Sequence, residues 1–80
     1  MILVDVQAMA TGEIYDFELD ENQTVEILLK EIKELISGKE QRAFSDEKFY
    51  LYAMYRECFL LENLSMKEQG VRSGERLIIF

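Results

Sequence analysis

The sequence predicts an α+β domain in which one amphipathic helix packs against a small mixed β-sheet. Residues 24–38 (TVEILLKEIKELISG) have apolar side chains at the spacing of a helix with one apolar face. The runs on either side of this segment instead alternate apolar and polar residues, as strands with one buried face do. Because so wide an apolar helix face must be covered, we expect the strands to form a sheet that holds the helix.

The predicted helix begins after Thr24, whose hydroxyl can accept a hydrogen bond from an amide group of the first turn. Glu26 in that turn suits the positive end of the helix dipole. Gly38 is expected to end the helix in the left-handed conformation. At about 1.5–3 kcal/mol for each buried side chain, the apolar face contributes on the order of 10 kcal/mol, so the fold needs no metal or disulfide. This face is predicted to consist of Val25, Leu28, Leu29, Ile32, Leu35 and Ile36.

Alternation of apolar and polar side chains predicts the strands. Residues 2–8 alternate in this way, and residues 14–19 repeat the pattern after a turn at Gly12, so the two runs form a hairpin. The second half of the chain adds a third strand, a short fourth strand and a closing strand. The five predicted strands cover residues 2–8, 14–19, 49–54, 58–61 and 76–80.

The connections between these elements have local signals of their own. Residues 39–48 are the most loop-like stretch of the chain, and we expect Phe44 to pack back onto the domain. Ser65 is expected to cap a brief helical turn that Gly70 ends. Gly74 then permits the turn that precedes the closing strand.

The order of elements also predicts the order of strands in the sheet. A closing strand at the end of a simple meander would not help to cover the helix. The compact solution places it beside the first strand and parallel to it, with the third strand on its other side and the helix within the parallel crossover. Eighty residues suffice for a single domain, so we predict one β-grasp domain spanning residues 1–80, with four to five strands.

The sequence resembles the ubiquitin-like proteins along most of its length. The resemblance rests on the hairpin, on the T-x-E helix start, and on the ending N-L-S-x-x-x-x-G-V-x-x-G-E-R-L-I-I-F. The closing segment GVRSGERLIIF is most similar to the YukD family, which comprises small ubiquitin-like proteins encoded with type VII (WXG-protein) secretion systems of Gram-positive bacteria. This resemblance implies a role through non-covalent contacts with a protein partner in the secretion machinery.

The sequence departs from conjugated modifiers and sulfur carriers, which end in a flexible Gly-Gly tail. It stops at Phe80 within the predicted closing strand, and its final glycine is Gly74. We therefore expect neither conjugation nor sulfur transfer. Two alternatives to a protein-binding module remain at this point: a carrier or modifier domain without the tail, and a structural homodimer.

The charge distribution disfavours some partners. The net charge is −7, and residues 1–40 account for all of it with ten acidic and three basic residues. Nucleic acids and anionic membrane surfaces are thus unsuitable partners, because binding phosphates requires a basic surface. The acidity can serve solubility, or it can steer a basic partner toward the domain. Apolar runs far shorter than the roughly 20 residues of a membrane span predict no membrane insertion.

The chemistry of the side chains predicts no enzyme. The chain has no histidine, which removes the commonest general base and metal ligand, and we expect no catalytic set, cofactor site or metal site. A single cysteine, Cys58, cannot form an internal disulfide, so a reducing, cytoplasmic location is expected. Its place in a short strand predicts a buried thiol with a packing role.

One face of the predicted sheet is a candidate binding surface. The strand residues expected to point toward the helix are Ile2, Val4, Val6, Tyr15, Phe17, Leu19, Phe49, Leu51, Leu77 and Ile79. The alternate residues then point away from it, and many of them are apolar or aromatic. The resemblance to ubiquitin agrees, since ubiquitin's main partner-binding surface lies on this face, with Tyr52, Ile78 and Phe80 on or beside it. The predicted partner-binding residues are Leu3, Tyr50, Tyr52, Ile78 and Phe80.

Overall fold

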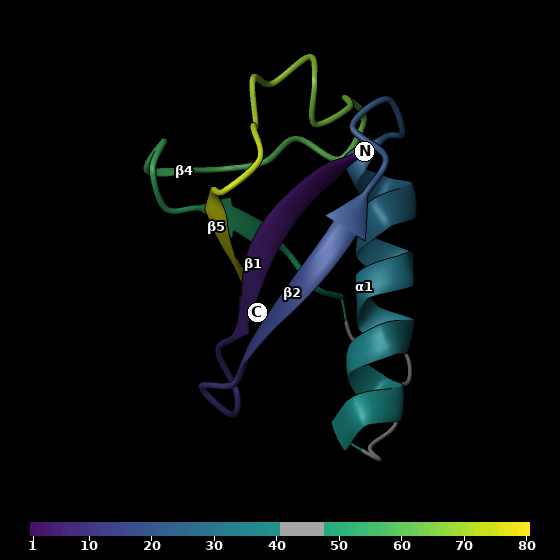
Figure 1. Cartoon of the computed structure of the whole chain (residues 1–80), viewed down its shortest axis with the longest axis vertical. Helices are drawn as coiled ribbons and strands as arrows, with labels where there is room; N and C mark the ends of the chain where they lie inside the picture. Colours follow the sequence, from purple (N-terminus) through teal and green to yellow (C-terminus); the bar gives the residue numbers. More distant parts are fainter. Residues whose placement is uncertain (41–47) are drawn as a thin grey trace.

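The computed structural model describes residues 1–40 and 48–80, with the side chains of residues 39 and 40 left aside. The expected packing of Phe44 lies outside the described residues. In these ranges the chain forms one helix and five strands (Figure 1). The elements are β1 (Ile2–Ala8), β2 (Ile14–Leu19), α1 (Val25–Glu40), β3 (Leu51–Ala53), β4 (Cys58–Phe59) and β5 (Arg76–Ile79).

The strands form one sheet in the order β2-β1-β5-β3-β4. β1 and β5 are parallel, with Val6 opposite Leu77, and the three other pairs are antiparallel. The first and last strands therefore lie side by side in the middle of the sheet, and α1 runs along the hairpin of β1 and β2 (Figure 1). This arrangement confirms the predicted β-grasp order of strands.

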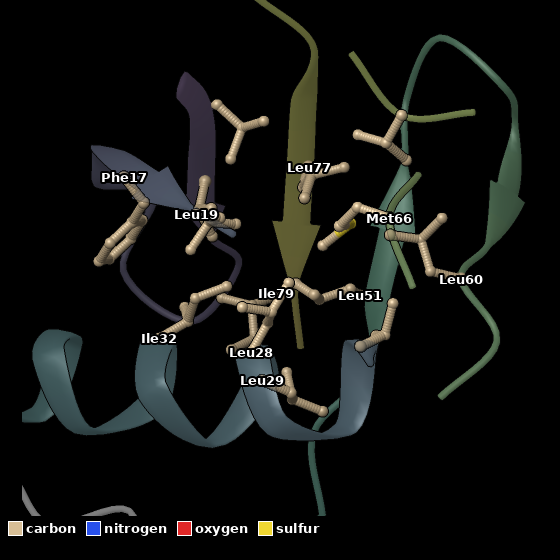
Figure 2. Close-up of a cluster of buried hydrophobic side chains, with 14 of the residues drawn as sticks. Phe17, Leu19, Leu28, Leu29, Ile32, Leu51, Leu60, Met66, Leu77 and Ile79 are labelled. Carbon is tan, nitrogen blue, oxygen red and sulfur yellow. The ribbon is translucent and has the colours of Figure 1, made fainter. Parts of the chain in front are cut away.

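The core lies between the helix and the inner face of the sheet. Figure 2 shows Leu28 and Ile32 of α1 pointing toward side chains of the strands, among them Ile79, and Leu29 and Leu77 are buried in the same cluster. The predicted inward strand residues are buried, or in the case of Ile2, Tyr15 and Phe49 partly buried against the core. Met66, from the segment between β4 and β5, is fully buried as well and closes one end of this core.

Two predictions about the helix are wrong. Leu35 is 51% exposed rather than buried. At 100° per residue it lies about 80° from the centre of the buried stripe, so it falls at the edge of the covered face. Gly38 does not end the helix, because α1 continues to Glu40, and the backbone at Gly38 does not have a positive φ. Gly12, Gly70 and Gly74 do have it, as their turns require.

A distant part of the chain holds the first turn of the helix. The amides of Val25 and Glu26 donate to the carbonyls of Leu64 (2.9 Å) and Glu62 (3.0 Å). These backbone bonds satisfy donors that we had expected the Thr24 hydroxyl to help satisfy. The turn after Leu64 is capped as predicted: the Ser65 hydroxyl accepts from the Glu68 amide, and the Glu68 carboxylate accepts from the Ser65 amide, both at 3.0 Å.

The prediction of a buried Cys58 is wrong, since this cysteine is exposed. It pairs with Ala53, which is fully buried, but β4 is a two-residue strand at the edge of the sheet. A residue on an edge strand has a neighbouring strand on one side only, so pairing with a buried residue does not cover it.

Candidate protein-interaction face

The face of the sheet turned away from α1 brings four of the five predicted residues together. Ile78 of β5 lies opposite Tyr52 of β3 and beside Gln7 of β1. Two residues further along the same strands, Tyr50 and Phe80 exchange backbone hydrogen bonds of 2.7 and 3.1 Å. These two pairings line up Tyr50, Tyr52, Ile78 and Phe80 on the outward face, because residues two apart on a strand share a side.

The sequence reasoning missed Phe59, which lies at the centre of this group. Its ring centroid is 5.2 Å from that of Tyr52, 5.6 Å from Phe80 and 6.4 Å from Tyr50. The interplanar angles of 74–88° are those of edge-to-face packing. We refer to Tyr50, Tyr52, Phe59 and Phe80 as the aromatic cluster. The predicted strands 49–54 and 58–61 leave a three-residue turn that would place Leu60 opposite Tyr52. In the structure Ala53 pairs with Cys58 across the four residues 54–57, and Phe59 lies opposite Tyr52.

The aromatic cluster is open to solvent. Phe59 is 54% exposed and Tyr50 is 47% exposed. Together with Phe80 they line an apolar hollow of about 330 Å³. Phe80 also lines a second apolar pocket of about 280 Å³ at the end of the hairpin, with Met9 and Phe49 among its other walls.

Leu3 does not join the aromatic cluster. It is exposed, but the parallel register pairs Asp5 with Arg76 and Gln7 with Ile78. Leu3 therefore lies four residues along the strands from Ile78, roughly 13 Å away. The ion pair between Arg76 and Asp5, at 3.5 Å, occupies the space between them.

The hairpin side of the same face is acidic. Asp5 and Asp16 lie directly opposite each other on β1 and β2, and Glu18 follows on β2. The hydrogen bond that protonated Asp16 donates to Asp5, together with the like charge of Asp5, raises the pKa of Asp16 above its usual value of about 3.8. We refer to Asp5, Asp16 and Glu18 as the acidic half of the face. The outward surface thus carries aromatic rings over β3, β4 and β5 and carboxylates over β1 and β2.

An ion pair between Lys48 and Glu62 lies beside Tyr50 at the edge of the aromatic cluster. The Lys48 ammonium lies 3.1 Å from a Glu62 carboxylate oxygen and 5.7 Å from the centroid of the Tyr50 ring. The hydrogen bond to Glu62, and then its charge, raise the pKa of Lys48. Lys48 therefore already forms an ion pair with Glu62 of its own chain.

Asp16→Asn is expected to stabilise the fold at neutral pH. A folded-state pKa above the unfolded value means that ionised Asp16 is disfavoured in the folded state, so the native carboxylate costs stability at pH 7 and costs nothing once it is protonated. The midpoint of urea unfolding should be higher for the variant than for wild type at pH 7, and the two should converge near pH 3. Glu18→Gln is the control, because Glu18 lies opposite Leu3 rather than a carboxylate. A gain that stays constant with pH would contradict this account.

The described residues offer no sign of metal or membrane-spanning sites. In residues 1–40 and 48–80, no three His, Cys, Asp or Glu side chains are grouped so that they could hold a metal ion. Within the same ranges, the structure contains no helix with the length and apolar character needed to cross a membrane.

Comparison with solved structures identifies the fold. The EccD5 ubiquitin-like domain from Mycobacterium xenopi superposes with a TM-score of 0.78 over 99% of this chain and 91% of that one, at 19% identity. The chain has the ubiquitin-like β-grasp fold. A de novo design based on ubiquitin matches with a TM-score of 0.75, 14% identity and coverage of 99% and 85%. No family model matches the sequence, and no curated protein matches it.

A further match places the ubiquitin-like fold in a larger protein. A chain of the MycP5-free ESX-5 inner membrane complex has a TM-score of 0.79 and 22% identity over 99% of this chain. The match covers 20% of that longer chain. Similarities at this level of identity concern the fold. Within it, the outward position of Tyr50, Tyr52, Ile78 and Phe80 agrees with the sequence analysis, and partner binding by these residues stays a prediction.

Proposed function

We propose that residues 1–80 form a non-enzymatic ubiquitin-like module that binds a protein partner through the outward face of its sheet. We further propose that it acts in the cytoplasm as an accessory or regulatory component of a bacterial type VII secretion system. The exposed aromatic cluster is the observation that carries the binding role. The secretion role is supported by the resemblance of the closing segment to the YukD family and by the structural likeness to the EccD5 ubiquitin-like domain and to a chain of the ESX-5 inner membrane complex.

The aromatic cluster has the properties of a binding surface. Monomeric proteins rarely leave contiguous apolar patches open to water without a use. Tyr and Phe are enriched at the centres of protein interfaces, where they supply large contact areas at a low cost in conformational entropy. Here three ring contacts and the pairing of Tyr50 with Phe80 fix the rings before any partner arrives. A surface ordered in advance loses less entropy on binding.

The exposed apolar residues of the helix do not form such a surface. Ile27 and Leu35 are exposed singly on the helix, and isolated apolar residues on a surface are ordinary. Leu35 is a useful reference, because its exposed fraction of 51% is close to the 54% of Phe59.

Capture of the partner from detergent-solubilised extracts of the native cell tests this function. Wild type and Leu35→Arg are expected to recover the same secretion-system protein. Phe59→Arg, and Tyr52→Arg combined with Ile78→Arg, should recover at least about 10-fold less, because a charge at the centre of an apolar interface removes its main contacts. Circular dichroism of each variant confirms that the fold is intact.

Two results would contradict the proposal. Equal capture by wild type and Phe59→Arg would show that the partner binds elsewhere. Recovery of the bait alone, with a dimeric molar mass by light scattering that Phe59→Arg reduces to the monomer value, would favour the homodimer alternative instead.

A further inference from the structure

We infer that the partner of the outward face is a basic protein segment. It would place an apolar or aromatic side chain against the aromatic cluster and lysine or arginine side chains over the acidic half. This inference rests on the proposed function and specifies the chemistry of the partner. It follows from the way in which two unlike surfaces adjoin on one rigid sheet.

The register of the sheet fixes the spacing between the two surfaces. Phe59, Tyr52, Ile78 and Gln7 form one continuous row across β4, β3, β5 and β1. Asp5 lies in the next outward-facing row, where it is paired with Arg76. Its strand, β1, is separated from the strand of Tyr52, β3, by β5. Strands lie about 4.8 Å apart, so the carboxylates begin roughly 10 Å from the rings. A single extended or helical segment spans that distance with a few residues.

The acidic half is short of cations. Arg76 is the single basic residue at the described outward positions of β1, β2 and β5, and it is already paired with Asp5 at 3.5 Å. Asp16 and Glu18 have no basic residue opposite them, since their strand partners are Asp5 and Leu3. Like charges directly across a strand pair repel each other. A partner's cation placed over Asp5 and Asp16 would relieve this repulsion, which gives a basic side chain an advantage that an acidic or neutral one lacks.

The net charge of the chain disfavours two other partners for this face, an acidic segment and a second copy of the chain. The net charge is −7, and the hairpin and helix region up to residue 40 carries all of it. Such a field speeds the approach of a basic segment and opposes that of an acidic one. A second copy of this chain brings the same −7, so self-association on this face works against the long-range repulsion.

A selection from a random displayed peptide library, with the 80-residue chain as bait, tests the inference. Peptides enriched on wild type are expected to combine apolar or aromatic residues with an excess of Lys and Arg. The best peptide should bind Asp16→Lys combined with Glu18→Lys at least about 10-fold more weakly than wild type. Glu31→Lys combined with Glu34→Lys is the matched control. It changes the net charge by the same amount on exposed positions of the helix, and its effect should stay below about threefold.

The outcomes separate the inference from the proposed function. Enriched peptides without excess Lys or Arg, or equal weakening by the two charge variants, overturn the basic partner. The binding face still stands in that case if Phe59→Arg abolishes binding of the selected peptides. If Phe59→Arg binds them as well as wild type does, or if no peptide is enriched, the assignment of the outward face as the binding surface is contradicted, and so is the inference of a basic partner. Dimerisation of the bait that Phe59→Arg abolishes would assign the face to a second copy and overturn both.

Discussion

Ile32→Ala is expected to lower the free energy of unfolding by about 2–4 kcal/mol, whereas Leu35→Ala should change it by less than about 0.5 kcal/mol. Both residues lie in the same helix and both belong to the apolar pattern of the sequence. Ile32 is fully buried beneath the sheet, while Leu35 is 51% exposed. Urea unfolding of the two variants and wild type at 25 °C measures the difference.

Alanine is the right replacement for this comparison because it has the highest helix propensity of all residues. Any loss of stability therefore reports lost packing rather than a weaker helix. For a domain of this size the Ile32→Ala loss corresponds to a melting temperature lower by roughly 10–25 °C. Similar losses for the two variants would mean that the helix buries a different face.

Arg56→Ala is expected to lower the free energy of unfolding by about 2–3 kcal/mol. The reason is Glu75, which is 6% exposed and so needs partners for its charge. One of its carboxylate oxygens accepts from the Arg72 amide at 2.7 Å and from the Arg56 guanidinium at 3.1 Å. Arg56 also donates to the Gly70 carbonyl and so ties two turns together. Its own side chain is 35% exposed, so the expected loss is smaller than for a fully buried pair.

A double-mutant cycle distinguishes the charge from the packing of the arginine. Adding Glu75→Gln to Arg56→Ala should recover part of the lost stability, because no charged group is then left buried without a partner. Guanidinium chloride would screen the ion pair, so urea is the suitable denaturant. Stability of Arg56→Ala within about 0.5 kcal/mol of wild type would show that the ion pair contributes little.

The fold was predictable from sequence because its periodic patterns are strong and mutually consistent. Alternation over β1 and β2 identified the buried side of each strand, and the need to cover the helix placed β5 beside β1. The errors lie at the margins of these patterns. Leu35 has the right spacing for the stripe, but spacing does not say how wide a face the sheet covers. Gly38 permits a helix to end, but it does not force the end.

The candidate site was predictable only in part. Alternation alone identifies the outward side of β3 and β5, and hence Tyr50, Tyr52, Ile78 and Phe80. Phe59 was missed because β4 has two residues, too few to show a period. Its register is set by a turn in which Glu57 adopts a φ of +52°. Leu3 does lie on the outward face, as predicted. Its distance from Ile78 depends on the parallel register of β1 and β5, which the alternation of apolar and polar residues does not reveal.

The central position of β1 and β5 has a consequence for the order in which the protein can assemble on the ribosome. At about 5–20 residues per second, roughly 2–8 s separate the synthesis of the helix end from that of β5. Until β5 is available, the hairpin and helix lack the strand that joins them to β3, and part of their apolar surface is uncovered. Residues 1–40 carry a charge of −7, so nascent chains on neighbouring ribosomes repel one another during the period in which they are most prone to aggregate.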